Sequence, residues 1–418
     1  MKKVLFIAFY FNHKNEIASK RLQGISKYLP KFGFETYTIV PKTQHETVKL
    51  ENTHVIETEY EDMIEKFLPS KQNQSTQTTN TQPAKSNTLL SKAISLAGEV
   101  FAYPDGMKYW YEPAFEKSCE IIEKENISAI ISSSFPITSH IIAHDLKEKY
   151  NIPWIADLRD LWNLNPYIHH TFIRNYFEKR LELKTFENAD ILTTTTSLAC
   201  KTLQKLHPSK KIIPVVSGYD ADDFKNINQT HFSDKLTLMY AGSLYNGKRD
   251  PSILFESINQ LIANKKIDPE KIIIDFYGDK NNLKELSEKY NVEKNIRIHG
   301  KITHEEVLKN QMNSDVLLLI SWMNESEKMF IPGKVYEYMA SKKPVLSIGY
   351  REGSLKDLIE KTQIGYHVSD VESCQKAIYD YYNKYINNEL EYCGNSFAEE
   401  YSMENTAKKF AQILEELQ

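Results

Sequence analysis

Glycine is scarce in this chain, with 14 residues among 418. Only four of them lie in the first half of the sequence. No G-x-G-x-x-G segment can be assembled from their positions, and the segment nearest to a P-loop, which begins at Gly242, has Arg249 where that motif requires serine or threonine. The sequence therefore excludes the two common glycine-rich phosphate-binding fingerprints.

The chain also lacks a cationic excess and paired cysteines. Lysine and arginine number 52 against 56 acidic residues, a net charge of −4, so a nucleic-acid partner is not expected. The four cysteines form no C-x-x-C pair and accompany no histidines at zinc spacing, which indicates free thiols in a reducing compartment.

Long apolar runs are missing as well. The opening run, residues 4–11, has eight residues and no cleavage site after it, so it is too short to span a membrane and does not resemble a signal peptide. We therefore expect a cytoplasmic location. Residues 89–111 place apolar side chains at roughly helical spacing before an aromatic cluster, a pattern that suits core packing or an interfacial helix in peripheral contact with the inner face of the membrane.

Apolar runs alternate with helical patterns in two series. The first series predicts a Rossmann-like α/β domain over residues 1–205, interrupted by a polar segment, about 69–88, that we expect to be a flexible insert. The second series has continuous apolar runs of the kind found in buried parallel strands, and it predicts a second doubly wound domain over residues 206–400.

Four runs of the second series end in glycine, at Gly242, Gly278, Gly300 and Gly349. Ligands of open α/β sheets bind outside the carboxyl ends of the strands, and glycine lets a ligand approach the backbone there. The second domain is therefore predicted to bind the more demanding ligand. Tight turns without a ligand are the alternative.

Two short segments carry candidate ligand contacts. Lys248 and Arg249 precede a predicted helix, whose free N–H groups would add to their charge and form an anion site that fits a diphosphate. Lys334 lies in the first turn of another helix, and the carboxylate of Glu337 could accept two ribose hydroxyls at once. The alternatives are a solvated cation pair and a helix-capping glutamate.

These segments together resemble glycosyltransferase family 4. The resemblance rests on the turn from Gly242 to Lys248, the segment 334–340 followed by Lys-Lys-Pro-Val, and the turn 217–220, in this order and spacing. It implies the GT-B fold, in which two Rossmann-like domains face each other across a cleft. It also implies retaining transfer from a nucleotide-diphosphate sugar, such as a UDP-sugar, to a glycan or polyprenyl-linked acceptor in bacterial surface polysaccharide or glycoconjugate synthesis.

By the same resemblance, Lys248 binds the donor diphosphate, the backbone of Gly242 faces the phosphates, and Glu337 is the second acid of an E-x7-E motif, which holds the ribose. Lys248 and Arg249 would support the departing phosphate as catalytic residues. No metal or other cofactor is implied. The expected donor-binding residues are Gly242, Ser243, Lys248, Gly278, Lys334 and Glu337.

The chain departs from the family pattern at two positions. Ser243 stands where the family often has arginine, and Arg249 could compensate. The first acid of the motif would fall on Met329, with Glu325 and Glu327 nearby. That acid normally contacts the transferred sugar, so the resemblance leaves the donor sugar and the retention of activity open.

Candidates in the first domain are fewer. Ser19 and Arg21 lie at the start of the first helix, where they could meet an acceptor or a phosphate; Arg21 could also be a solvated helix cation. Asp157, Arg159 and Asp160 follow a predicted strand, as in D-x-R-D-x-W segments of polysaccharide-building relatives. The two aspartates are expected to orient the acceptor hydroxyl during catalysis, with a structural salt-bridged corner as the alternative.

Three further expectations remain. His140 and His144 are one helical turn apart but have no third ligand nearby, so no metal site is expected. A terminal amphipathic helix, about 404–417, resembles the helix that packs back on the first domain in this fold. The rival functions are a sugar-nucleotide epimerase of the same fold and a nucleotide-binding pseudoenzyme or assembly partner.

Overall fold

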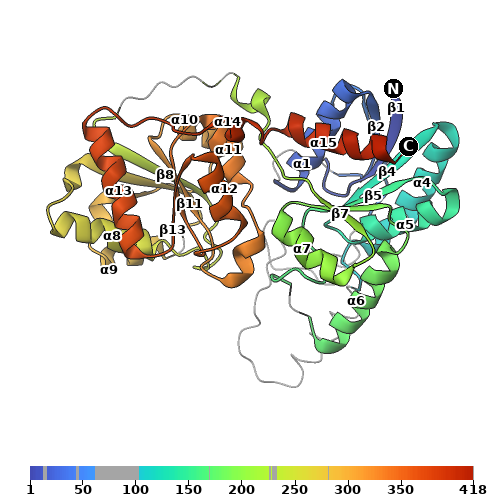
Figure 1. Ribbon diagram of the computed structural model, residues 1–418, viewed down its shortest axis with the longest axis horizontal. Helices are drawn as coiled ribbons and strands as arrows, with labels where there is room; N and C mark the ends of the chain where they lie inside the picture. The colour runs from blue at the N-terminus through green and yellow to red at the C-terminus, as the bar shows by residue number, and fades with distance from the viewer. Residues whose placement is uncertain are drawn as a thin grey trace. The chain divides into compact units, whose positions relative to one another are not determined.

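The computed structural model describes residues 1–12, 17–43, 47–61, 103–168, 170–225, 227, 233–280 and 282–417. They form two compact units (Figure 1), unit 1 with Met1–Val215 and Ala407–Gln418, and unit 2 with Val216–Thr406. The expected insert at 69–88 and most of the segment 89–111 lie outside the described residues.

Unit 1 contains a seven-stranded parallel sheet in the order β3-β2-β1-β4-β5-β6-β7. Its last strand follows residue 205, yet it belongs to unit 1 because it pairs with β6. The division between the units therefore comes later in the chain than the expected one. The strands are β1 (Lys2–Ile7), β2 (Phe34–Pro41), β3 (Thr53–Thr58), β4 (Ile127–Ser133), β5 (Trp154–Leu158), β6 (Ile191–Thr194) and β7 (Lys211–Pro214).

Helices cover both faces of this sheet. The strand order runs outward from β1 in two directions. Because crossovers between parallel strands are right-handed, this order puts α1 on one face of the sheet and the helices between β3 and β6 on the other. The guanidinium carbon of Arg21 on α1 lies 5.7 Å from the ring centre of Phe410, so α15 packs beside α1. The helices are α1 (Ile17–Tyr28), α4 (Tyr111–Lys124), α5 (Thr138–Tyr150), α6 (Phe172–Phe186), α7 (Ser197–Leu206) and α15 (Met403–Glu416), whose first four residues belong to unit 2.

Unit 2 contains a six-stranded parallel sheet in the order β10-β9-β8-β11-β12-β13. The prediction of two doubly wound parallel sheets is therefore confirmed. The strands are β8 (Leu236–Gly242), β9 (Ile272–Gly278), β10 (Ile296–Ile298), β11 (Val316–Ile320), β12 (Val345–Ile348) and β13 (Gly365–Val368).

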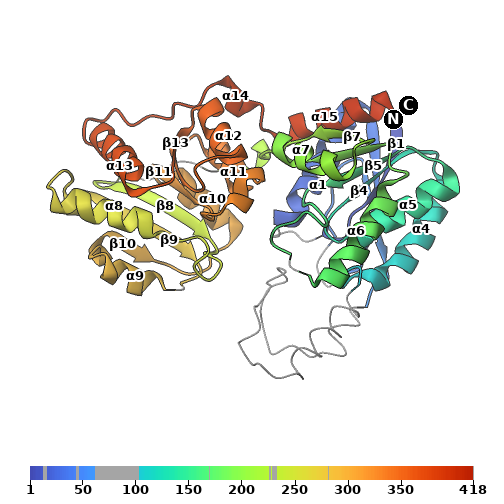
Figure 2. The same ribbon diagram turned by 60° about the horizontal axis from the view of Figure 1, so that its bottom comes forward.

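The helices of unit 2 lie on both faces of the sheet, with α8, α9 and α13 on one side and α10, α11 and α12 on the other (Figure 2). The central strand β8 supplies both cores: Leu238 and Tyr240 face the first, whereas Met239 and Ala241 face the second. This burial on two sides explains its continuous apolar run. The helices are α8 (Ser252–Ala263), α9 (Leu283–Lys289), α10 (His304–Met312), α11 (Lys334–Ser341), α12 (Ser354–Thr362), α13 (Val371–Ile386) and α14 (Ser396–Glu399).

Candidate functional site

The strand order of unit 2 reverses direction between β8 and β11, and ligands of doubly wound sheets bind outside the carboxyl ends of such neighbouring strands. Gly242 ends β8 there with φ +140°, and it lies opposite Gly278 of β9, whose φ is +123°. A Cβ atom on Gly242 would lie 2.0 Å from Nζ of Lys334. Glycine at position 242 therefore makes room for the Lys334 side chain.

The ammonium group of Lys334 is the central feature of this site. Its Nζ atom is buried and has no hydrogen-bond partner in the described part of the chain, and it lies 4.5 Å from the ring centre of Tyr240. Desolvation and then the charge of Arg249 lower the pKa of Lys334 from 10.5 to about 7, against the opposing effect of Glu337. A buried amine beside a second cation is poised to accept an anion.

The turn after β8 brings Arg249 back towards Lys334. Tyr245 and Asn246 adopt positive φ angles, and the backbone N–H of Arg249 donates to the carbonyl oxygen of Leu244 at 3.1 Å. The guanidinium carbon of Arg249 lies 4.4 Å from the ring centre of Tyr245. The charge of Arg249 acts on Lys334, so these two sequence-predicted cations are brought together.

Lys248 extends towards the end of β11, where its Nζ atom lies 4.6 Å from the ring centre of Trp322. Cation–π contact fixes a lysine without neutralising its charge. Trp322 was not singled out from the sequence, although an aromatic residue two positions after a buried strand is a detectable signal.

Ser243 is held by internal hydrogen bonds rather than left open. Its hydroxyl donates to the carboxylate of Asp279, its carbonyl accepts from the Tyr240 hydroxyl at 2.8 Å, and its Oγ accepts from the N–H of Tyr245 at 3.1 Å. These contacts fix the turn. Tyr240 and Asp279 were also missed in the sequence, and Asp279 could have been found because it directly follows the glycine that ends β9.

The expected ribose ligand Glu337 lies in the first turn of α11, where Oε1 is 3.8 Å from Nε2 of His304. Its charge acts on Lys334, so it belongs to the same electrostatic cluster.

Met329 ends the short helix η6 (Glu325–Met329). Glu325 accepts a hydrogen bond from Lys328 at 2.7 Å, whereas the charge of Glu327 acts on Arg249. Of the two acids near Met329, Glu327 is therefore the one coupled to the cationic cluster.

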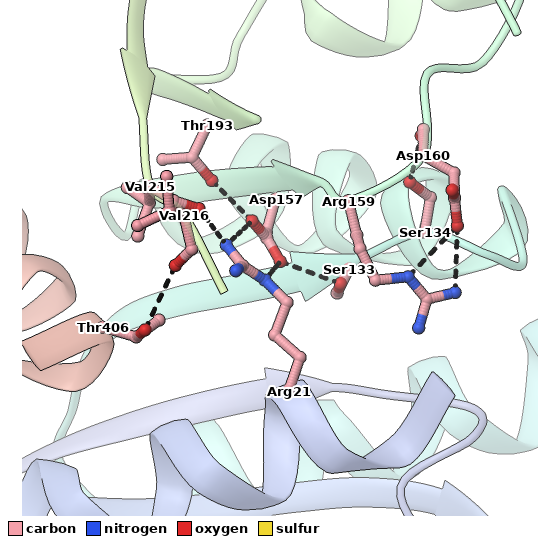
Figure 3. Close-up of polar contacts among 10 residues, drawn as sticks. All are labelled: Arg21, Ser133, Ser134, Asp157, Arg159, Asp160, Thr193, Val215, Val216 and Thr406. Atoms are coloured by element: carbon pink, nitrogen blue, oxygen red, sulfur yellow. Dashed lines mark hydrogen bonds and ion pairs between the residues drawn. The ribbon is translucent and has the colours of Figure 1, made fainter. Parts of the chain in front are cut away.

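In unit 1, Asp157 is completely buried and accepts hydrogen bonds from Arg21 at 3.0 and 3.1 Å and from the hydroxyls of Ser133 and Thr193 (Figure 3). Burial would raise the pKa of Asp157, but Arg21 and the hydroxyls outweigh it and lower the value. Arg21 is buried too, as is Ser19 on the same helix. The contacts favour the structural salt bridge for Arg21 and Asp157; their roles towards substrate stay predictions.

Arg159 and Asp160 form a separate, partly exposed pair in Figure 3, with Nη2 and Oδ2 3.0 Å apart. The Ser134 hydroxyl fixes this corner by donating to the carbonyl oxygen of Asp160 at 2.9 Å. An acceptor contact by this pair stays a prediction.

The two histidines of α5 have different surroundings in the structure. His140 is buried and shares a hydrogen bond with Ser132, and desolvation lowers its pKa to about 3. Asp145 and Glu148 offer oxygen atoms within 4.8 Å of a ring nitrogen of His144, but this group does not include His140, and the expectation of no metal stays a prediction. Nδ1 of His144 already contacts the carbonyl oxygen of Thr185, at 2.9 Å.

The described end of the segment 89–111 belongs to the fold of unit 1. Trp110 is completely buried, and its indole N–H donates to the hydroxyl of Thr58 at 2.8 Å. Core packing is therefore confirmed for this aromatic residue. Among the helices that the structure describes, we find none with the length and apolarity required to cross a bilayer.

Comparisons with known proteins agree with this architecture. Residues 235–384 match the family model described as "Glycosyl transferases group 1". Comparison with curated proteins gives no match. The family match covers most of unit 2, including the turn after β8 and the start of α11.

Solved structures of similar fold cover the whole chain. Sucrose-phosphate synthase from Thermosynechococcus elongatus aligns with TM-score 0.67 and 13% identity over 100% of this chain and 99% of its own. HepE from Anabaena in complex with UDP aligns with TM-score 0.60 and 12% identity over 100% of both chains. UDP-GlcNAc 2-epimerase from Methanocaldococcus jannaschii aligns with TM-score 0.53 and 13% identity, also over 100% of both chains.

The fold is therefore GT-B, with two Rossmann-like parallel-sheet domains. The family match in unit 2 and this fold together indicate that the chain is an enzyme of the glycosyltransferase class.

Proposed function

We propose that this chain transfers a sugar, with retention of anomeric configuration, from a nucleotide-diphosphate donor to a hydroxyl of a glycan or lipid-linked acceptor. The observation that carries the proposal is the buried Nζ of Lys334, which has no hydrogen-bond partner among the described residues and lies against Gly242 beside the charge of Arg249. An anionic ligand would compensate this cationic cluster.

The chemistry needs positioning and charge stabilisation more than a dedicated base. As the bond from the anomeric carbon to the diphosphate breaks, Lys248, Arg249 and Lys334 stabilise the negative charge that develops on the phosphate. The acceptor oxygen bonds to the anomeric carbon on the same face, and its proton passes to the departing phosphate oxygen. Glu337 holds the ribose, and no metal or other cofactor is required.

The donor to test first is a UDP-sugar, because the similar HepE structures contain UDP and UDP-glucose. A thermal-shift screen of sugar nucleotides identifies the donor, since a ligand that binds only the folded state raises its stability. Release of UDP in the presence of acceptors then measures transfer, and NMR of the product shows whether the configuration is retained.

Lys248→Ala provides the test of the diphosphate assignment. Because charge-assisted contacts contribute about 1.5–3 kcal/mol, UDP should bind this variant about ten- to a hundredfold more weakly, whereas uridine should bind as before. Transfer should be abolished. Unchanged UDP binding and unchanged transfer would contradict the assignment.

Epimerisation is the second candidate, favoured by the structural similarity to UDP-GlcNAc 2-epimerase. Incubation with UDP-sugars in the absence of acceptor separates the two: an epimerase interconverts the sugars, whereas a transferase gives at most slow hydrolysis. UDP binding without turnover on any acceptor would instead indicate a pseudoenzyme. Membership of family 4 and a role in bacterial polysaccharide or glycoconjugate synthesis at the cytoplasmic face of the membrane are parts of the main proposal.

A further inference from the structure

Helix α6 buries charged side chains on the face that it turns towards unit 1. Three charged side chains at four-residue spacing, Arg174, Glu178 and Glu182, are buried on its inner face. Such residues are almost never fully buried unless they are paired. The last turn of α6 also buries Phe186, so polar contacts along the helix and one aromatic side chain at its end hold α6 to unit 1.

Those polar contacts are complete for the two glutamates. Glu178 accepts from Nε of Arg174 at 2.8 Å and from the Trp162 indole at 2.6 Å. Glu182 accepts from the backbone N–H of Asn163 at 3.0 Å, and its other oxygen lies 3.2 Å from Nε2 of His207. Both carboxylates are therefore committed to the interior of unit 1.

The outer face of α6 carries the apolar side chains that an ordinary helix would bury. Phe172 is 86% exposed, Ile173 66%, Phe177 53% and Tyr176 52%. Their spacing places them on one side of the helix. An exposed cluster of large apolar groups of this kind marks an interaction surface.

All exposed charges within α6 are positive. Lys179, Arg180 and Lys184 are exposed, and Nη1 of Arg180 contacts the hydroxyl of Tyr176 at 3.0 Å. With the two glutamates turned inward, the outer face combines aromatic and aliphatic groups with three cations. Apolar side chains and cations on one exposed face suit the boundary between anionic headgroups and acyl chains.

We propose that the outer face of α6, defined by Phe172, Ile173, Tyr176, Phe177, Lys179, Arg180, Leu183 and Lys184, binds the surface of an anionic lipid bilayer. The apolar groups enter the boundary between headgroups and acyl chains, and the cations contact anionic headgroups. A second copy of the chain fits this face less well, since a two-fold interface would bring the same cations together. The surface lies outside the proposed donor site, so it extends the proposed function.

Flotation of the full chain with lipid vesicles tests the apolar part. The chain should bind vesicles of phosphatidylcholine with about 30% phosphatidylglycerol more tightly than vesicles of phosphatidylcholine alone. The double variant Phe172→Ser/Phe177→Ser should bind the anionic vesicles at least about tenfold more weakly, because two aromatic side chains no longer enter the interface. The matched control Tyr379→Ser/Phe397→Ser, which removes exposed aromatics of unit 2, should bind as the unmodified chain does.

A triple variant tests the charged part. Lys179→Gln/Arg180→Gln/Lys184→Gln should weaken binding to the anionic vesicles about a hundredfold and remove the preference for them. The control Lys124→Gln/Lys201→Gln/Lys205→Gln removes the same charge from exposed lysines of α4 and α7 and should retain both affinity and preference.

All four variants should keep the melting temperature and the UDP affinity of the unmodified chain, because the substituted side chains are exposed and lie outside the donor site. Failure of UDP binding in the unmodified chain would count against the proposed function and leave the membrane surface standing. The membrane proposal is overturned if the unmodified chain does not bind anionic vesicles, or if the α6 variants bind them as tightly as the controls do. It is equally overturned if the α6 face instead forms a dimer that Phe172→Ser/Phe177→Ser dissociates.

Discussion

In the proposed donor site, Lys334 should make donor binding dependent on pH, because its pKa of about 7 lies well below the ordinary value of 10.5. A diphosphate favours the charged amine, so binding raises this pKa. Below pH 7 the amine is charged in the free and bound states, and it contributes no pH dependence. Above pH 7 the free protein has lost the proton, so affinity should fall up to about tenfold per pH unit until the pKa of the complex is reached.

Calorimetry in buffers of different ionisation enthalpy should therefore detect proton uptake when UDP binds at pH 8. The control is Lys334→Met, which should bind UDP more weakly and lack the uptake attributable to this amine. Ionisation of the phosphates is common to both proteins, so the difference between them isolates Lys334. Equal proton uptake in both would contradict the assignment.

Substitutions at Gly242 and Gly247 distinguish a steric clash from backbone strain. Both Gly242 and Gly247 have positive φ angles, +140° and +84°, but an added Cβ meets Nζ of Lys334 only at position 242 and has open space at 247. Gly242→Ala should therefore displace the Lys334 side chain and weaken UDP binding at least about tenfold, since a charge-assisted contact is lost. Gly247→Ala should cost about 1 kcal/mol of stability and little affinity. Thermal unfolding and UDP titration of both variants measure this contrast.

At the scale of the element, the Arg21–Asp157 pair joins α1 to the sheet of unit 1. Asp157→Asn leaves the buried guanidinium without its counter-charge and should lower the free energy of unfolding by about 3–5 kcal/mol. The matched substitution Asp160→Asn breaks a partly exposed pair and should cost about 0–1 kcal/mol. Urea unfolding compares the two variants, and equal effects would remove the structural role assigned to Asp157.

The lowered pKa of Asp157 also contributes to the loss of stability at acid pH. Because the folded-state pKa of Asp157 is lowered, its contribution is present above the ordinary value of 3.8 and is lost as the pH falls through the lower folded value.

The sequence predicts helices and strands better than it predicts which distant side chains contact each other. The continuous apolar run of β8 identifies a strand buried on both sides, and the turn after it carries recognisable cations. Arg21 and Asp157, however, are 136 positions apart, and no local pattern specifies that they meet. Which side chains of α6 face inward cannot be predicted from its sequence, because that face depends on buried polar partners that only the folded chain supplies.

At the scale of the whole molecule, unit 1 is made of two separate chain segments, whereas unit 2 is made of one. Unit 1 needs residues 407–418 from the end of the chain, whose Phe410, Ile413 and Leu414 are buried. A fragment of residues 1–215 should therefore expose their docking surface. With about 1.5–3 kcal/mol lost for each large side chain, it should melt at lower temperature than the full chain or aggregate. Addition of a peptide of residues 403–418 should restore part of the loss.

Unit 2 is one uninterrupted segment, and hydrogen bonds of neighbouring residues define where it begins. The carbonyl oxygen of Val215 accepts from Arg21 within unit 1, whereas that of Val216 accepts from Thr406 within unit 2 at 3.1 Å (Figure 3). The chain therefore passes between the units at two peptide bonds, after Val215 and after Thr406, and Thr406 closes unit 2 against its own first residue. A fragment of residues 216–406 should fold alone, because both of its cores are built from residues within those limits.

The same fragment contains Gly242, Lys248, Arg249, Lys334 and Glu337. It should therefore bind UDP with an affinity within about threefold of the full chain, a difference below 1 kcal/mol, and should transfer no sugar. Circular dichroism establishes that the fragment is folded, and calorimetry gives its UDP affinity, with the fragment carrying Lys248→Ala as the control. A folded fragment that does not bind UDP would mean that unit 1 supplies essential donor contacts, and the assignment of the donor site to unit 2 alone would then be wrong.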